Sequence, residues 1–222
     1  MTPPSAALIW ELVGRTAVVS LTATAIAMAI GVPAGTALGM LRFRGRGTVA
    51  ATVNTGMALP TVVVGLVVAL MLFRGGPLGS LNLIYTVRGM IIAQVLIAVP
   101  LITGITMAAI QALPEELPDQ LRALGANRLQ LVGRLWIEAR LPLLAAIMAG
   151  FGHAVSEVGA ATMVGGNIHG QTQVLTTAIV EDVGKGDFAP ALAYGAVLLA
   201  LAFAVNAVLT SVQQRGAAWA QS

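Results

Sequence analysis

Four stretches of this 222-residue chain contain no Asp, Glu, Lys or Arg over 26 or 27 consecutive residues. They are residues 16–41, 47–73, 89–114 and 188–214. A helix needs about 20 apolar residues to cross the ~30 Å hydrocarbon core of a bilayer, so each stretch can span it with some tilt. Charged residues make up only 9% of the chain, whereas a soluble domain carries roughly 25%. The sequence therefore predicts an all-α integral membrane protein.

The number of spans depends on residues 141–180. The segment "GGNIHGQTQ" (165–173) is polar and rich in glycine, and the apolar run after it, "VLTTAIV", has only seven residues. Because irregular backbone cannot face lipid, we predict one span followed by a short half-helix here. The result is five spans in a single domain, 1–222. They cover about 14–41, 49–73, 89–112, 141–161 and 188–212, with longer loops at 113–140 and 162–187.

Proline and glycine shape the predicted spans. Pro33, Pro60 and Pro100 lie well inside them, where each proline removes a helix hydrogen bond and favours a kink. In "GVPAGTALG" (31–39), glycine recurs every fourth residue. Such a ridge of small residues lets another helix approach closely.

The basic residues predict the orientation of the chain. With five spans, eight of them fall on one side: Arg42, Arg44, Arg46, Arg122, Arg128, Arg134, Arg140 and Arg215. Four fall on the other side: Arg15, Arg74, Arg88 and Lys185. Cytoplasmic loops carry the excess of Lys and Arg, so we expect the N-terminus outside and the C-terminus in the cytoplasm. The pI of 10.2 is explained by these loops, and nucleic acid is not an expected partner.

The basic loop 113–140 is built to form two short helices. Asn127 can cap a new helix, and Gln130 completes the spacing of a capping box. Gly125 suits the tight end of a preceding helix that begins near Pro118. The face at i, i+3 and i+7 is apolar and consists of Leu129, Val132 and Trp136. By itself this pattern also fits an ordinary amphipathic connector.

The same loop resembles the cytoplasmic loop of permease subunits of binding-protein-dependent ABC importers. In that family the loop runs Glu-Ala-Ala, three residues, Gly, and then a helix that ends in Leu-Pro. Here Asp119 retains the acidic first position, Gly125 matches the glycine, and Leu141-Pro142 match the ending four residues late. The resemblance implies a type I, MetI-like fold and a coupling loop that docks on an ATPase subunit. The implied coupling residues are Asp119, Gly125, Ala126, Asn127, Arg128, Leu129 and Gln130. A bulky side chain at Gly125 is expected to clash at the helix junction or in the docking groove.

Other stretches resemble the oxyanion branch of this family. They are "ALPTVVVGLVVALML" (58–72), "RGGPLGSL" (74–81) and "IAVPLI" (97–102). The stretch "SEVGAATMVGGNIHGQTQVLTTAI" (156–179) is similar to tungstate permeases. The resemblance implies a homodimer in a bacterial or archaeal cytoplasmic membrane, with two ATPase subunits that bind ATP and Mg and an extracytoplasmic oxyanion-binding protein. The expected cargo is tungstate, with molybdate or sulfate as alternatives.

The expected substrate pathway combines this resemblance with the chemistry of the spans. The resemblance places Glu157 and Gly159 at the start of the outer gating segment. No Lys or Arg lies in the core of any predicted span, so a passing anion would meet only helix N-termini, backbone amides and hydroxyl groups. The hydroxyl candidates are Thr162, Thr172 and Thr176.

Three other functions are weaker predictions. A phosphate-binding P-loop requires Gly-Lys-Ser/Thr, but the only lysine is Lys185 in "VGKGD", so we expect ATP hydrolysis in a partner. His153 and Glu157 share a helix face and could instead support a proton-coupled secondary transporter or, with Ser156, a catalytic triad. His169 with Asn167 offers too few ligands for a metal site. A membrane enzyme is disfavoured because the sequence has no recognisable nucleophile motif such as Gly-x-Ser-x-Gly.

Overall fold

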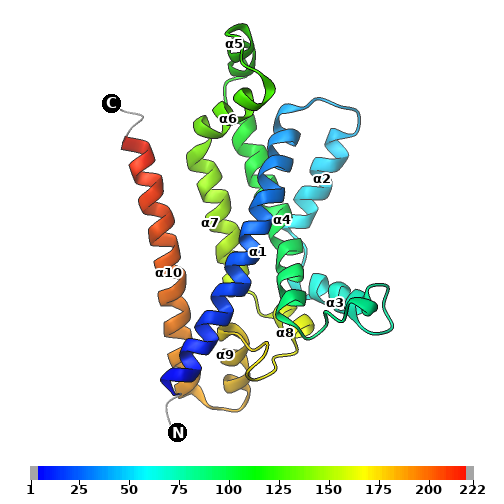
Figure 1. Cartoon of the computed structure of the whole chain (residues 1–222), viewed down its shortest axis with the longest axis vertical. Helices are drawn as coiled ribbons and strands as arrows, with labels where there is room; N and C mark the ends of the chain where they lie inside the picture. Colours follow the sequence, from blue (N-terminus) through cyan, green and yellow to red (C-terminus); the bar gives the residue numbers. More distant parts are fainter. Residues whose placement is uncertain (1–4, 219–222) are drawn as a thin grey trace.

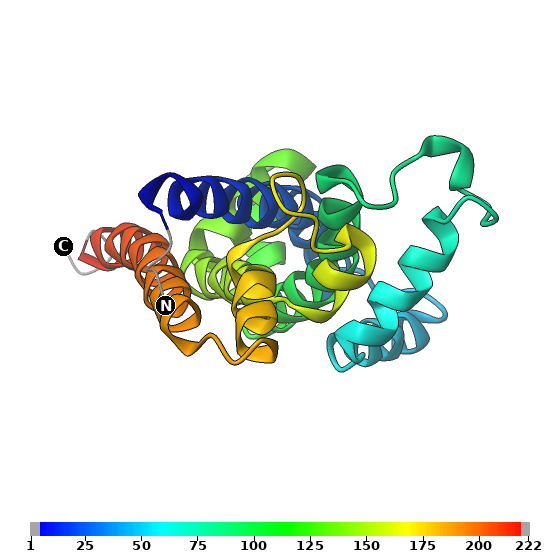
Figure 2. The same cartoon turned by 90° about the horizontal axis from the view of Figure 1, so that it is seen from below.

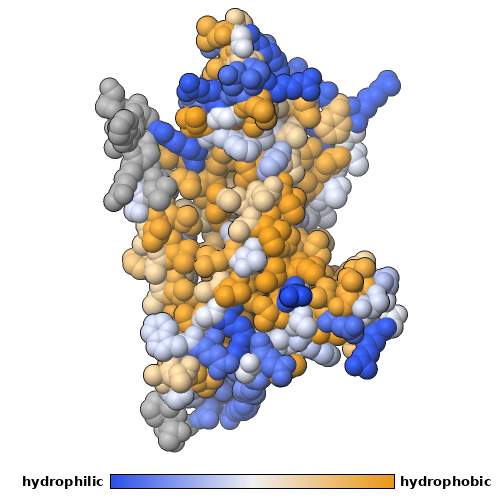
Figure 3. Space-filling view, in the orientation of Figure 1, coloured by the Kyte–Doolittle hydropathy of each residue, from blue (hydrophilic) through white to orange (hydrophobic). Residues whose placement is uncertain are grey.

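The computed structural model describes residues 5–218, and every regular element in this range is a helix (Figure 1). The helices are α1 (Ala6–Met40), α2 (Arg46–Met57), α3 (Thr61–Leu72), η1 (Gly79–Leu81), α4 (Val87–Gln111), α5 (Leu117–Ala123), α6 (Arg128–Glu138), α7 (Arg140–Ser156), α8 (Gly159–Gly165), α9 (Leu175–Gly184) and α10 (Phe188–Ala218). Within this range α1, α4 and α10 are long and apolar enough to cross a membrane, and two bent helix pairs raise the number of candidate spans to five. An apolar band separates two hydrophilic ends of the molecule (Figure 3).

The two ends of the molecule carry different elements. The N-terminus of α1, α8 and α9 lie at one end, whereas α5, α6 and the α1–α2 loop lie at the other (Figure 1). We call these the α9 end and the α6 end. Seen from the α9 end, α3 and α8 lie to one side of α9 and α10 to the other (Figure 2). The arginine-rich loop 42–46 and the basic α5–α6 segment therefore share one end. Which end faces the cytoplasm stays a prediction.

Pro60 breaks the second predicted span. The expected helix at 49–73 consists instead of α2 and α3, which meet at 99°. Pro60 lies at the N-cap of α3, not inside a helix as predicted, because proline lacks an N–H and disfavours helical backbone at the preceding residue. Each 12-residue helix is about 18 Å long, so neither one alone crosses a bilayer. Pro33 and Pro100 do lie inside continuous helices.

The fourth predicted span, 141–161, also differs in the structure. Its helix, α7, ends at Ser156, and α8 begins at Gly159 after a two-residue break. The polar stretch that follows, 166–174, is a loop between α8 and α9. At its other end, α7 meets α6 at 76°. As a result α6 lies across the end of the bundle rather than continuing the membrane helix.

The glycine ridge on α1 packs against α4, as predicted. A Cβ atom added at Gly35 would lie 2.5 Å from the carbonyl oxygen of Thr103. At Gly31 and Gly39 the added atom would lie 3.0 Å and 2.8 Å from Ile102 and Ile110, respectively. Contacts this short leave no space for a side chain, so the spacing of the glycines fixes how closely α1 and α4 approach.

One buried apolar cluster joins the α6 end to the membrane helices. Leu131 and Leu135 of α6 pack with Val32 of α1, Ile110 of α4 and Leu143 of α7. All five side chains are buried. The short helix α6 is therefore anchored to three longer helices at once.

Candidate functional site

The junction between α5 and α6 has the predicted geometry. The backbone N–H of Gln130 donates to Asn127 Oδ1, and the N–H of Asn127 donates to Gln130 Oε1, both over 2.9 Å. This reciprocal pair confirms the capping box. Gly125 has φ +85°, a left-handed conformation that glycine adopts without a steric penalty. An added Cβ there meets no atom within 4 Å, so the expected clash at the helix junction is wrong within this chain, and a substitution would strain the backbone instead.

The buried face of α6 is not the apolar face formed by Leu129, Val132 and Trp136. Leu131 and Leu135 face the bundle, whereas Leu129 is 85% exposed. The difference arises because the 76° bend to α7 turns α6 so that an i, i+4 pair reaches the apolar cluster. Leu124, which is 84% exposed, and Leu129 therefore lie on either side of Gly125 as two exposed leucines. Exposed apolar groups at a polar end of the molecule are typical of a protein contact.

The remaining residues predicted for the coupling loop lie on the same exposed segment. Asp119 accepts a hydrogen bond of 2.8 Å from Arg122, and both side chains are largely exposed. Ala126 follows Gly125 in the turn, and Arg128 is the first residue of α6. The structure thus brings together all seven predicted residues on one short helix–turn–helix tip.

Glu157 occupies the break between α7 and α8. It is only 7% exposed, and its Oε1 accepts a hydrogen bond of 2.9 Å from the N–H of Ala160 in the first turn of α8. The hydroxyl of Thr176 donates to the Glu157 carbonyl oxygen over 2.8 Å, which ties α9 to the break. A Cβ at Gly159 would lie 2.6 Å from Val62 of α3. Glu157, Gly159 and Thr176 therefore meet at one point.

The threonine hydroxyls are engaged by the backbone. Thr162 donates to the carbonyl oxygen of Val158 over 2.8 Å, and Thr172 donates to that of Gly165 over 2.6 Å. With Thr176 bound to Glu157, all three predicted hydroxyl groups direct their protons at carbonyl oxygens. In this conformation Thr172 ties the loop to α8 and Thr176 ties α9 to the α7–α8 break, and none of the three protons is free to meet an anion.

A narrow crevice beside Glu157 contains a residue that the sequence analysis missed. It encloses about 170 Å³ of empty space, with no room for a water-sized sphere. Its polar lining comes from Thr16, Ser20, Gln94, Glu157 and Thr176. Gln94 is 4% exposed, and its Oε1 is buried without a hydrogen-bond partner among the described residues. An unpaired buried acceptor costs about 1–3 kcal/mol. The only available sequence signal was one amide in the apolar run "MIIAQVLIAVP" (90–100).

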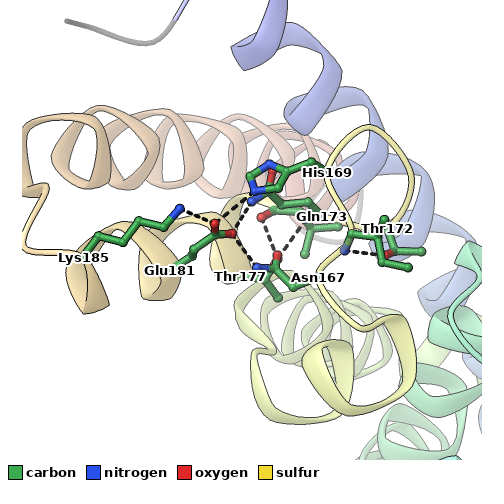
Figure 4. Close-up of polar contacts among 9 residues, drawn as sticks. Asn167, His169, Thr172, Gln173, Thr177, Glu181 and Lys185 are labelled. Carbon is green, nitrogen blue, oxygen red and sulfur yellow. Dashed lines mark hydrogen bonds and ion pairs between the residues drawn. The ribbon is translucent and has the colours of Figure 1, made fainter.

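Glu181 on α9 organises the polar loop (Figure 4). Its Oε2 accepts hydrogen bonds from Asn167 Nδ2 at 2.7 Å and from Gln173 Nε2 at 2.8 Å. Its Oε1 contacts His169 Nε2 at 3.0 Å and pairs with Lys185. We call Glu181 and these four partners the Glu181 cluster. Because three of the partners lie in loop 166–174, the cluster fastens this loop to α9.

The hydrogen bonds of the cluster keep Glu181 ionised. Burial would by itself raise the pKa of this carboxyl group, but the hydrogen bonds from Lys185, His169 and Asn167 outweigh burial and lower the pKa to about 2. Glu181 could not be predicted from local sequence patterns because three of its partners lie 8 to 14 residues away, beyond any helical spacing. Only the Glu181–Lys185 pair has the i, i+4 spacing of a helix.

Replacing Glu181 with glutamine should loosen the loop. Hydrogen bonds to charged groups each contribute about 1.5–3 kcal/mol, so we expect the unfolding temperature in detergent at pH 7 to fall by roughly 5–10 °C. Since the folded pKa is lowered, the stabilisation is present above pH 4.5 and is lost as the pH falls toward 2. The difference in unfolding temperature between the wild type and the variant should therefore become smaller as the pH is lowered. Glu116→Gln, at an exposed residue of the α6 end, is the control. Equal losses in the two variants would contradict the role of the cluster.

The groups proposed for the alternative functions are not assembled. The Glu157 carboxylate bonds to the N–H of Ala160, and the hydroxyl of Ser156 donates to the carbonyl oxygens of Gly152 and His153. Within residues 5–218, the His153 ring makes no hydrogen bond to either side chain. This geometry is neither that of a triad nor that of a His–Glu proton relay.

Comparison with known proteins identifies the family. Residues 31–216 match the family described as the binding-protein-dependent transport system inner membrane component. The chain belongs to this family. It is therefore a multi-pass component of the inner membrane that serves in transport, rather than an enzyme.

Relatives and solved structures agree with this assignment. The chain is 42% identical to the tungstate uptake system permease protein of Peptoclostridium acidaminophilum, over 88% of this chain and 86% of the relative. It is 40% identical to a probable anion ABC transporter permease protein of Haloferax volcanii, over 86% and 84%. A structure of the MetNI methionine ABC transporter in an inward-facing conformation matches with a TM-score of 0.79 at 19% identity, over 96% of this chain and 99% of that chain. The last similarity confirms the MetI-like fold.

Proposed function

We propose that this chain is the permease subunit of an ATP-driven importer of tungstate. The observation that carries the proposal is the 42% identity to a tungstate uptake permease over 88% of the chain. This extent includes the α6 end, the α7–α8 break and the Glu181 cluster, so the similarity is not confined to a generic membrane helix. Molybdate and sulfate are the alternative cargoes.

The chemistry of the spans supports a small dianion as cargo. The central parts of the spans lack Lys and Arg, so the chain offers no tight ionic site that would retain the anion. Polar groups near the α7–α8 break come instead from Thr16, Ser20, Gln94 and Thr176, beside the Glu157 carboxylate. Weak binding suits a conduit that receives an already selected anion and must release it. Selectivity then belongs mainly to a separate binding protein.

The exposed tip at Gly125 supports an ATPase as a partner. Leu124 and Leu129 are bare, and the capping box fixes the helix that carries Leu129. We propose that two copies of this chain, two ATPase subunits that bind ATP and Mg, and an extracytoplasmic oxyanion-binding protein form the importer. The binding protein would meet the α9 end, and the ATPases would meet the α6 end in the cytoplasm. The eight-to-four distribution of basic residues supports this orientation.

Competition for uptake tests the cargo. Cells that produce this chain with its own ATPase and binding protein should take up labelled tungstate. Unlabelled tungstate should compete most strongly, molybdate less and sulfate least. Cells with the same ATPase and binding protein but without this chain are the control. Stronger competition by sulfate than by tungstate would refute the assignment, and equal competition by molybdate would reduce it to the broader class of oxyanions.

A further inference from the structure

A side-chain hydrogen bond joins α6 directly to α1. The indole Nε1 of Trp136 on α6 donates to Thr36 Oγ1 over 2.9 Å, across 100 residues of sequence. Thr36 is 3% exposed, and its own hydroxyl proton goes to the carbonyl oxygen of Val32 over 2.7 Å. With the proton committed to Val32, the oxygen presents its lone pairs to the indole. The direction of the hydrogen bond is therefore fixed.

Thr36 lies near the point at which α1 passes from an apolar cleft beside α7 to close contact with α4. It comes three residues after Pro33, which leaves a helix hydrogen bond unmade. Just beyond Pro33, Gly35 is in close contact with α4. On the other side of Pro33, Val32 and Met28 line an apolar cleft of about 390 Å³, together with Leu143 and Ile147 of α7. Trp136 also lines this cleft.

Trp136 connects α6 to α1 through a hydrogen bond rather than by filling space in the apolar core. Its neighbour Leu135 is buried in the apolar cluster that joins α6 to α4 and α7, whereas Trp136 itself remains 37% exposed. Leu135 thus anchors α6 through apolar packing, which is not directional. A hydrogen bond to a buried hydroxyl is directional, so Trp136 sets the position of α6 along α1.

We infer that Trp136 is a positioning residue that transmits movement of the α5–α6 segment to α1. The inference rests on the proposed function, in which this segment contacts the ATPase. When the segment moves, the Trp136–Thr36 hydrogen bond pulls the part of α1 beyond Pro33 with it. Because the glycine ridge holds that part of α1 to α4, both helices respond together.

Conservative variants separate this role from simple packing. Trp136→Phe keeps an aromatic ring but removes the N–H, Thr36→Val removes the acceptor, and Thr36→Ser retains it. In proteoliposomes with the ATPase and the binding protein, the first two variants should lower substrate transported per ATP hydrolysed by up to about fivefold, because the loss of one neutral hydrogen bond shifts the equilibrium toward the uncoupled state by about that factor. Thr36→Ser should behave as wild type. The double variant should be no worse than either single variant, because both remove the same bond.

Two controls separate this role from anchoring in the bilayer and from loss of assembly. An interfacial anchor is an ordinary role for tryptophan in membrane proteins, and Trp10, 73% exposed on α1 at the α9 end, is the matched site. Trp10→Phe should leave the transport ratio unchanged. Co-purification of the ATPase should be the same for every variant. A normal ratio in Thr36→Val, or losses that multiply in the double variant, would overturn the inference. Failure of the ATPase to bind even the wild type would overturn the proposed function instead.

Discussion

Replacing Gly35 with valine should separate α1 from α4 and destabilise the whole bundle. The added Cβ would lie 2.5 Å from the Thr103 carbonyl oxygen and 2.7 Å from Thr106 Cβ. Because the first of these atoms belongs to the backbone, no side-chain rotation relieves the clash. Overpacking of this kind costs about 3 kcal/mol, which corresponds to a fall of roughly 6–12 °C in the unfolding temperature.

Gly14 on the same helix provides the matched control. A Cβ at Gly14 meets no atom within 4 Å, so Gly14→Val introduces the same side chain without a clash. The unfolding temperature of the detergent-solubilised protein, followed by size-exclusion chromatography after heating, should fall in Gly35→Val and stay near wild type in Gly14→Val. Equal behaviour of the two variants would show that the glycine ridge does not determine the packing of α1 on α4.

The sequence predicted the features that depend on neighbouring residues. The glycine ridge repeats every fourth residue and thus lies on one helix face, and the capping box depends on Asn127 and Gln130, three residues apart. Both are local patterns with one geometric outcome. The prediction of one continuous helix over 49–73 was wrong because hydropathy shows that a segment is apolar but not the direction in which its helix runs. Pro60 indicated an irregularity in the helix, but the 99° angle between α2 and α3 depends on how α3 packs against α8.

The candidate site was harder to predict because its key contacts are long-range. Glu181 was overlooked because it binds loop residues that share no helix face with it. Gln94 was overlooked because a single amide in an apolar run gives no pattern. The sequence could not show which side of α6 is buried, since α6 carries two overlapping apolar faces and Leu129 lies on the exposed one. The bend between α6 and α7 determines which of these two apolar faces is turned toward the bundle.

Replacing Leu129 with serine should weaken binding of the ATPase without unfolding the chain. Leu129 is 85% exposed, so its removal costs little in the isolated permease. If docking buries it, the loss is about 1.5–3 kcal/mol, or roughly ten- to hundredfold in Kd. Titration of the ATPase onto the permease in nanodiscs measures this change. Leu81→Ser is the control, because Leu81 is 56% exposed on η1, away from the α6 end (Figure 1).

The same two positions report the orientation that this docking requires. The chain contains no cysteine, so Leu81→Cys and Leu129→Cys each introduce a single thiol. A membrane-impermeant reagent should label Leu81→Cys in intact cells and Leu129→Cys only after the cells are opened. Labelling of Leu129→Cys from outside would place the α6 end on the wrong side for a cytoplasmic ATPase. An unchanged Kd in Leu129→Ser, with correct labelling, would leave the orientation intact and exclude Leu129 from the contact, because a buried leucine cannot be lost without weakening the complex.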